Sequence, residues 1–139
     1  MVILSGVAGV GKTAVIKKYY EQQKEKNPFY VFKATEFNNL RNLNDFFKSF
    51  DFKEFIKAHE NEKEKIIVID SAEKLLDIDN TDPFKEFLQV VLENKWKVIF
   101  TSRDNYVDVL NTESTEIYGI LPVNINVQNL TLGKLTPIV

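Results

Sequence analysis

Short apolar runs recur along the chain and predict the strands of a sheet. Two of them, KIIVID at residues 65–70 and KVIFT at residues 97–101, are almost continuously apolar, as expected of strands buried on both faces. Near the end of the chain, Asn124 and Asn126 alternate with apolar side chains, which indicates a half-exposed edge strand. The five predicted strands are Val2 to Leu4, Phe29 to Lys33, Lys65 to Asp70, Lys97 to Thr101 and Val123 to Val127.

Between the first three strands, apolar residues recur at helical spacing. The first predicted helix covers residues 13–26 and is stopped by an Asn-Pro pair. Residues 39–50 and 51–59 carry two apolar sets in different registers, which predicts two short helices. The second begins at Asp51, with a glutamate three residues on as in a capping box. We interpret the phenylalanines of both segments as core side chains that pack against the sheet. We expect the second strand to be buried enough to carry aromatic side chains on both of its faces. His59 is expected at an exposed helix end.

The second half of the chain predicts two more helices. One covers residues 82–94, with Asp82 as N-cap and Pro83 in the first helical position. The other is a short helix over residues 104–110, capped by its first residue and followed by a polar loop at residues 111–116. Strands and helices thus alternate throughout, which predicts an α/β fold: a parallel sheet covered by helices on both faces.

Composition limits the classes of function. A chain of 139 residues with 44% hydrophobic side chains is long enough for one domain with a proper core. We interpret it as a piece of a larger protein, because its first strand begins directly behind Met1. The net charge of −2 gives no signal for nucleic acid or an anionic membrane. The absence of cysteine, of a signal peptide and of a long apolar run fits a cytoplasmic protein.

A glycine-rich turn between the first strand and the first helix carries the clearest chemical signal. In VILSGVAGVGKTAV, the residues Gly6, Gly11, Lys12 and Thr13 satisfy the pattern G-x-x-x-x-G-K-[ST] in its strand-turn-helix context. Glycines let successive N–H groups turn inward on a phosphate at the positive end of the helix. Lys12 would reach the β- and γ-phosphates, and the Thr13 hydroxyl would bind Mg²⁺. The residues expected to bind nucleotide are Gly6, Val7, Ala8, Gly9, Val10, Gly11, Lys12, Thr13, Ala14 and Thr101.

Acidic and polar residues follow two of the buried strands. Asp70 would orient the Mg²⁺ shell, with a strand-end capping role as the alternative. Glu73 would position or deprotonate the attacking water, although a glutamate in an exposed first helical turn is common. Thr101 and Ser102 would hydrogen-bond the water or the γ-phosphate. Arg103 would neutralise charge on the γ-phosphate, unless it forms a surface salt bridge with Asp104 or another acid. The predicted catalytic residues are Lys12, Asp70, Glu73 and Arg103, and the predicted metal ligands are Thr13 and Asp70.

Two classes of nucleotide enzyme are disfavoured by missing residues. A GTPase needs an Asn-Lys-x-Asp guanine reader and usually Asp-x-x-Gly after the metal acid, whereas this chain has TSRD and DSAE there. Small-molecule kinases with this loop use several arginines to bind the transferred phosphate. The chain contains only Arg41 and Arg103. Guanine specificity and small-molecule kinase activity are therefore disfavoured.

Three segments in this order and spacing, GVAGVGKT, IIVIDSAEKL and KVIFTSRD, resemble the nucleotide-binding core of the STAND class of signal-transduction ATPases, relatives of AAA+ and NACHT modules. The resemblance implies a three-layer P-loop NTPase domain over residues 1–139, with a five-stranded parallel sheet in the order 5-1-4-3-2. It implies an ATP or ADP site with Mg²⁺ at the carboxyl ends of strands one and three. Proteins of this class are typically cytosolic switches that self-associate with ATP, and many in bacteria resemble antiviral defence proteins. The segment NLTLGKL after the last strand only weakly resembles the entry to their helical lid.

The sequence thus supports three hypotheses. The first is an ATP-binding and slowly hydrolysing domain of a larger signalling ATPase. The second is a nucleotide-gated switch or oligomerisation module with little turnover alone. The third is the core of an AAA+-type mechanical or DNA-associated ATPase, whose further chain would carry a lid with a sensor arginine.

Overall fold

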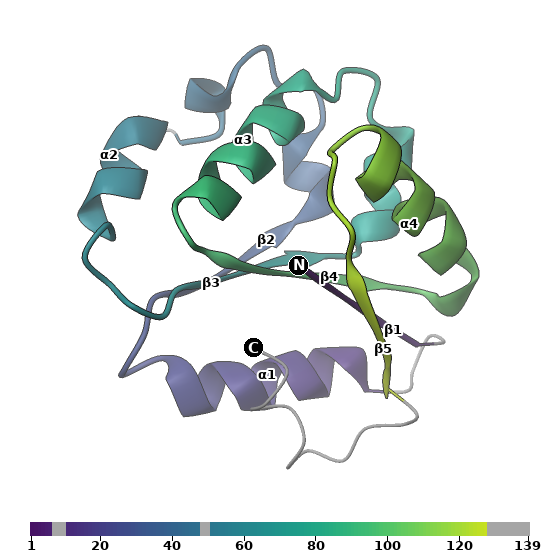
Figure 1. Cartoon of the computed structure of the whole chain (residues 1–139), viewed down its shortest axis with the longest axis horizontal. Coiled ribbons are helices and arrows are strands. Elements are labelled where there is room, and N and C mark those ends of the chain that lie inside the picture. The colour runs from purple at the N-terminus through teal and green to yellow at the C-terminus, as the bar shows by residue number, and fades with distance from the viewer. Residues whose placement is uncertain (7–10, 48–50, 128–139) are drawn as a thin grey trace.

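A five-stranded parallel sheet forms the centre of the protein. The computed structural model describes residues 1–6, 11–47 and 51–127, which include all five predicted strands (Figure 1). Each neighbouring pair of strands is parallel, in the order β2-β3-β4-β1-β5. This confirms the predicted order 5-1-4-3-2, counted from the opposite edge. The strands are β1 (Val2–Ser5), β2 (Phe29–Lys33), β3 (Ile66–Asp70), β4 (Lys97–Ser102) and β5 (Val123–Asn126).

The strand order brings three strand ends together at one edge of the sheet. Because β4 lies between β3 and β1, the carboxyl ends of all three strands are neighbours. Ile69 of β3 pairs with Phe100 of β4, so the next residues along, Asp70 and Thr101, also lie side by side. In open parallel sheets, ligands bind outside the carboxyl ends of the strands, where the order of strands reverses. This edge is where the predicted site residues should be sought.

Helices cover both faces of the sheet, as predicted. Figure 1 shows α1 (Lys12–Gln23) on one face, with α2 (Phe52–Ala58), α3 (Asp82–Glu93) and α4 (Val107–Glu116) on the other. The core is divided accordingly into two groups of buried side chains, one on each face. Within the described ranges, no helix combines the length and the apolar character that a membrane span requires.

Most aromatic side chains lie between the sheet and α2, α3 and α4. Phe87 of α3 is fully buried, and its ring centroid lies 5.2 Å from that of Phe37. Phe52 of α2 is also buried, 5.6 Å from Phe87 between ring centroids. Full burial of such a ring contributes about 1.5–3 kcal/mol. Phe52 and Phe55 are thus confirmed as core, and Phe47 packs against the core partly buried, whereas Phe50 lies outside the described residues.

One predicted helix in this region was wrong. Within the predicted segment 39–50, the described residues form only a 3₁₀ helix at Leu43–Asp45, and residues 48–50 lie outside the described ranges. Asn42 is the N-cap of this 3₁₀ helix, and its side chain accepts a hydrogen bond from the Asp45 amide over 3.2 Å. Asparagine side chains compete for backbone groups in this way and favour turns over continuous helix.

The two predicted helix starts had different outcomes. Asp51 caps α2, because its Oδ1 accepts a hydrogen bond from the Glu54 amide over 2.8 Å. The predicted Asp82 cap was wrong by one residue: Asp82 is the first residue of α3 and Thr81 is the N-cap, without a side-chain bond. The Asp82 amide instead donates a hydrogen bond to Oδ1 of Asn80 over 3.1 Å.

The predicted polar loop at residues 111–116 was also wrong, because α4 continues through it to Glu116. The hydroxyls of Thr112 and Thr115 each bond to the carbonyl oxygen four residues earlier, at 3.0 Å. Leu110 and Ser114 are buried on one side of the helix. Burial of one side and internal satisfaction of the polar side chains outweigh the low helix propensity of this stretch.

His59 lies at the end of α2, as its C-cap, but it is not exposed as expected. It is half-buried, and its Nε2 is 2.8 Å from the hydroxyl oxygen of Tyr30. Its ring centroid lies 5.5 Å from that of Trp96 and 5.6 Å from that of Phe55. Burial in this aromatic group lowers the pKa of His59 below its ordinary value.

The second strand is less buried than predicted. β2 is an edge strand, and Val31 on it is 48% exposed. Phe29 is buried against α1, whereas Tyr30 and Phe32 are only partly buried on the other face. The position of β2 at the edge of the sheet explains its lower burial, because among the described residues no further strand pairs with its outer side.

Candidate functional site

The turn between β1 and α1 begins at Gly6 and ends at Gly11, both of which the structure describes. The Gly6 amide donates a hydrogen bond to the Ser102 carbonyl over 3.2 Å, which ties the start of the turn to β4. Gly11 is the N-cap of α1 with φ of 96°, a left-handed conformation that favours glycine. Space is not the reason for this glycine, since an added Cβ would meet nothing within 4 Å. The predicted phosphate-binding residues Val7, Ala8, Gly9 and Val10 lie outside the described residues, so their roles stay predictions.

Lys12 and Thr13 open α1 at its positive end. Lys12 is the first residue of the helix, and its Nζ donates a hydrogen bond to the Gly6 carbonyl over 2.7 Å. The lysine therefore reaches back over the turn that it follows. Thr13 and Ala14 are exposed beside it, and the first turn of α1 contains no acidic residue. The partial positive charge of the helix start is thus available to an anion.

Asp70 is held at the end of β3 by the neighbouring strand. The Thr101 hydroxyl donates to Oδ1 of Asp70 over 2.6 Å and accepts from the Ser71 amide over 2.9 Å. Among the described residues, nothing donates to the other oxygen of Asp70. Ser71 has φ of 57°, in the left-handed region that a residue with a Cβ rarely adopts. The predicted role of Asp70 as a strand-end acid with an oxygen left for ligand contact fits this arrangement.

Glu73 lies in the turn after β3, within the 3₁₀ helix η3 (Ala72–Asp77). Its Oε2 is buried and has no hydrogen-bond partner in the described part of the chain. A carboxylate oxygen left unpaired in this way costs free energy and is seldom found without a water, an ion or a ligand to satisfy it. Glu73 is therefore more than the exposed first-turn glutamate that the sequence left as an alternative.

Ser102, the last residue of β4, and Arg103, which follows it, differ in burial and in their contacts. Ser102 is fully buried, and its hydroxyl donates to the Arg103 carbonyl over 3.0 Å. Arg103 is exposed and forms no ion pair within the described residues. Asp104, the first residue of a 3₁₀ helix, accepts a hydrogen bond from the Asn126 side chain over 3.0 Å instead. The alternative of a salt bridge between Arg103 and Asp104 is not observed, and neither is an Asp104 cap.

These residues share one cavity at the carboxyl edge of the sheet. It has a volume of about 220 Å³ and lies between the start of α1 and the ends of β3 and β4. The cavity brings together all predicted catalytic residues and both predicted metal ligands. Its lining consists of Lys12, Thr13, Asp70, Ser71, Glu73, Lys74, Thr101, Ser102 and Arg103.

A second hollow adjoins it across Lys12. It has a volume of about 490 Å³ and is lined by Gly11, Lys12, Thr13, Ala14 and Lys17, so it includes the predicted residue Ala14. Sequence reasoning assigned no role to Lys17, or to Ser71 and Lys74 in the first cavity. Ser71 and Lys74 lie in the DSAEK segment next to the predicted acids, and Lys17 lies one helical turn after Thr13. Their closeness along the chain to predicted site residues is the signal that could have found them.

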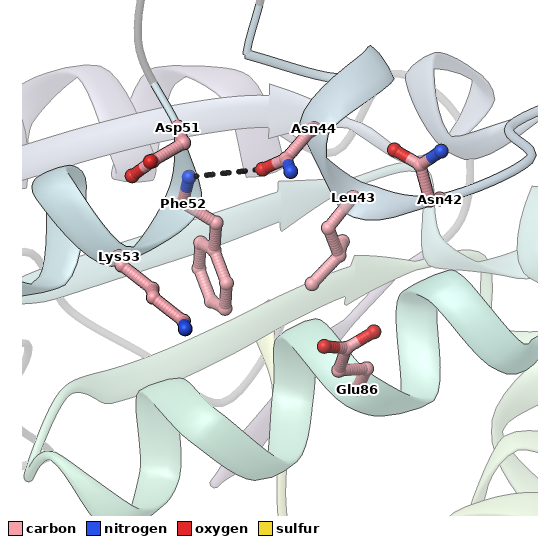
Figure 2. Close-up of a pocket in the computed structure, with 7 residues that line it drawn as sticks. All are labelled: Asn42, Leu43, Asn44, Asp51, Phe52, Lys53 and Glu86. Atoms are coloured by element: carbon pink, nitrogen blue, oxygen red, sulfur yellow. Dashed lines mark hydrogen bonds between the residues drawn. The ribbon is translucent and has the colours of Figure 1, made fainter.

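A further hollow, of about 260 Å³, lies far from this edge, between α3 and the start of α2 (Figure 2). Its polar side chains already serve the backbone. Asn44 Oδ1 accepts from the Phe52 amide over 3.4 Å, and Asp51 caps α2. Figure 2 shows Lys53 and Glu86 projecting from α2 and α3 at its rim. Groups committed to capping and exposed charges do not make a catalytic site, so the cavity beside Lys12 is the candidate.

The donor set around Asp70 fits a magnesium ion that arrives with a nucleotide. The described residues contain no group of three or more acidic or histidine side chains that would hold a cation alone. Mg²⁺ usually binds through one or two carboxylates together with substrate phosphates and water. Thr13 and the unpaired oxygen of Asp70, lining one cavity, supply that kind of incomplete set.

Comparisons with known proteins agree with this fold. Residues 1–118 match the family described as an AAA domain. Among solved structures, the crystal structure of THEP1 from the hyperthermophile Aquifex aeolicus is similar, with a TM-score of 0.57 and 15% sequence identity over 99% of this chain and 97% of that chain. No curated protein matches the chain. Neither comparison distinguishes the STAND class. The chain belongs to the AAA domain family and has the fold of a P-loop NTPase.

Proposed function

We propose that this chain is the ATP-binding, Mg²⁺-dependent NTPase core of a STAND-type signalling ATPase. The observation that carries the proposal is the convergence of Lys12, Thr13, Asp70, Glu73 and Arg103 on one cavity. Proteins with a P-loop NTPase fold generally bind a nucleotide with Mg²⁺, which supports the assignment. The missing guanine-reading motif favours ATP over GTP.

The start of α1 binds the phosphates. Lys12 exchanges the Gly6 carbonyl, now 2.7 Å from its Nζ, for oxygens of the β- and γ-phosphates. The N–H groups of the first helical turn add donors at the positive end of the helix dipole. Thr13 and Asp70 hold Mg²⁺, which when bound neutralises charge that develops on the phosphate oxygens. Binding of the triphosphate is therefore a task of α1 and the end of β3.

The end of β4 and the turn after β3 act on the γ-phosphate. Glu73 accepts a proton from the attacking water, whose oxygen bonds to the γ-phosphorus as the bond to the ADP oxygen breaks. Its buried Oε2, which has no hydrogen-bond partner among the described residues, provides the acceptor. Arg103 donates hydrogen bonds to the γ-phosphate oxygens, since no acid among the described residues holds it elsewhere. The products are ADP and inorganic phosphate.

The decisive test is nucleotide binding by the Lys12→Ala variant. Isothermal titration calorimetry with Mg²⁺ and ATP should show binding by the wild-type chain and none by the variant, because the charged donor to the phosphates is gone. Lys18→Ala is the matched control: Lys18 is an exposed lysine of the same helix and lines neither hollow. Equal affinities for wild type and Lys12→Ala would refute the proposal.

A second candidate is a nucleotide-gated switch that turns over little by itself. The cavity of about 220 Å³ supports it, since it is smaller than the roughly 300–1,000 Å³ typical of ligand sites. In this candidate, a lid or a second copy of the chain completes the site. Phosphate release measured over a range of protein concentrations separates the candidates. A rate that rises faster than concentration indicates self-association, and no release at any concentration favours the switch.

The narrower assignment to signalling rests on the three segments that resemble STAND proteins. An AAA+-type mechanical ATPase remains compatible with the AAA domain match. The two differ in the parts of the protein that flank the core. Sensor repeats and an effector beside this domain would support signalling, whereas a lid with a sensor arginine would support the mechanical class.

A further inference from the structure

The Thr101 side chain makes two hydrogen bonds at the end of β4 while it is only 2% exposed. Its hydroxyl donates to Asp70 Oδ1 over 2.6 Å and accepts from the Ser71 amide over 2.9 Å. The first bond is short and has a charged acceptor, which makes it one of the stronger kinds of hydrogen bond. One hydroxyl therefore holds both the Asp70 carboxylate and the peptide that follows it.

This engagement argues against a direct contact between Thr101 and a phosphate. A hydroxyl has one proton to donate, and Thr101 donates it to Asp70. Ionised phosphate oxygens accept hydrogen bonds and need a donor. Ser102 does not supply one either, because its hydroxyl donates to the Arg103 carbonyl. Thr101 can thus influence a bound nucleotide only through the residues that it holds.

The Ser71 peptide depends on this contact. Its left-handed conformation, with φ of 57° and ψ of 52°, is unfavourable for a residue with a Cβ and persists only where the surroundings hold it. Thr101 holds the amide of Ser71, and the Lys74 amide donates to its carbonyl over 3.0 Å. The second bond opens η3, so the conformation of Ser71 sets the direction in which that turn leaves β3.

The direction of η3 decides where Glu73 lies. Ala72 is fully buried and Leu75 is 2% exposed, so both anchor one side of the turn in the core. Glu73 comes to lie on the cavity side, where its Oε2 is buried and no residue of the described ranges bonds to it. An extended or right-handed Ser71 would turn the chain elsewhere and take Glu73 away from the cavity.

We infer that Thr101 is a positioning residue for both carboxylates of the site. It occupies Oδ1 of Asp70, so that Oδ2 is the oxygen left for the metal shell, and it keeps Glu73 at the cavity through the left-handed Ser71. This inference rests on the proposed function, because it uses the roles assigned there to Asp70 and Glu73. It revises the expectation that Thr101 binds the nucleotide itself.

The test compares Thr101→Val, which keeps the shape and removes the hydroxyl, with Thr101→Ser, which keeps the hydroxyl. Three quantities are measured: ATP affinity without Mg²⁺, the Mg²⁺ concentration for half-maximal ATP binding, and kcat. Thr101→Val should leave metal-free ATP affinity unchanged, raise the Mg²⁺ requirement about 10- to 100-fold and lower kcat by a similar factor, as for other groups that orient metal-site residues. Thr101→Ser should stay close to wild type in all three.

Amide hydrogen exchange in the nucleotide-free protein gives a readout independent of activity. The Ser71 amide should be protected in wild type and in Thr101→Ser, although it lies outside the strands, and should exchange faster in Thr101→Val. Rapid exchange of Ser71 in wild type would overturn the inference even if Thr101→Val failed to fold. So would an unchanged Mg²⁺ requirement in Thr101→Val, a loss of metal-free affinity, or equal defects in both variants. Failure of the proposed function is distinct, since the wild-type chain would then bind no ATP with Mg²⁺.

Discussion

Replacement of Glu73 by glutamine separates ATP binding from hydrolysis. Glu73→Gln keeps the length and shape of the side chain but removes its capacity to accept a proton from water. Glu73 lines the cavity together with Lys12 and Asp70, and its Oε2 is buried without a partner in residues 1–6, 11–47 and 51–127. We expect the variant to bind ATP at least as tightly as wild type, because a negative charge near the phosphates is lost, and to hydrolyse it far more slowly.

The expected loss in kcat depends on how much a general base contributes and on whether a neighbouring acid can replace Glu73 in that role. A positioned general base typically contributes about 10²- to 10⁴-fold, equivalent to about 2.7–5.4 kcal/mol of barrier. The other acid of the cavity, Asp70, cannot fully replace Glu73 as the base, since its Oδ1 already accepts a hydrogen bond from the Thr101 hydroxyl. A loss of at least about 100-fold is therefore expected.

The assay is steady-state phosphate release at saturating ATP and Mg²⁺, combined with calorimetric ATP binding by the same preparation. Glu86→Gln is the matched control, because Glu86 is an exposed glutamate of α3 that lines the hollow in Figure 2 and not the cavity. A kcat for Glu73→Gln within about threefold of wild type would refute the assignment of Glu73 as base. A parallel loss of ATP affinity would show that Glu73 serves binding instead.

Two predictions concern stability. Phe87→Ala should lower the free energy of unfolding by about 3–5 kcal/mol in urea titrations, because the ring is fully buried, whereas Val109→Ala at a 47% exposed site should change it by less than about 0.5 kcal/mol. Burial lowers the pKa of His59, so the folded state disfavours its protonation. The stability that His59 contributes should be complete above its ordinary pKa of 6.5 and decline as pH falls below it. Urea midpoints of wild type and His59→Phe against pH test this, and parallel curves would contradict it.

Local patterns predicted much of the fold. The apolar runs that end in Asp70 and in Ser102 are buried strands, because only a strand covered on both faces by other elements can be apolar at every position. Asp51 was identified as a helix cap from its own side chain and its spacing to the next glutamate. Signals of this kind are contained within a few residues, and the sequence displays them directly.

The predictions that were wrong failed because they depend on contacts between residues distant in the sequence. The helical stretch at residues 111–116 looks like a loop by composition, and burial of Leu110 and Ser114 against the rest of the protein makes it a helix. His59 stands beside a charged run in the sequence, yet Tyr30 and Trp96 enclose it from other elements. In both cases, residues distant along the chain supply the contacts that decide the outcome.

The sequence by itself determined which residues are proposed to carry the chemistry: a lysine and threonine at a helix start, and acids at and just after the end of a buried strand. Only the tertiary structure decided how they act on one another. The strand order sets β4 beside β3, and thereby brings the Thr101 hydroxyl to 2.6 Å from Asp70 and 2.9 Å from the Ser71 amide. A hydrogen bond requires two groups within about 3 Å, and for residues some thirty positions apart this distance is set by the pairing of strands.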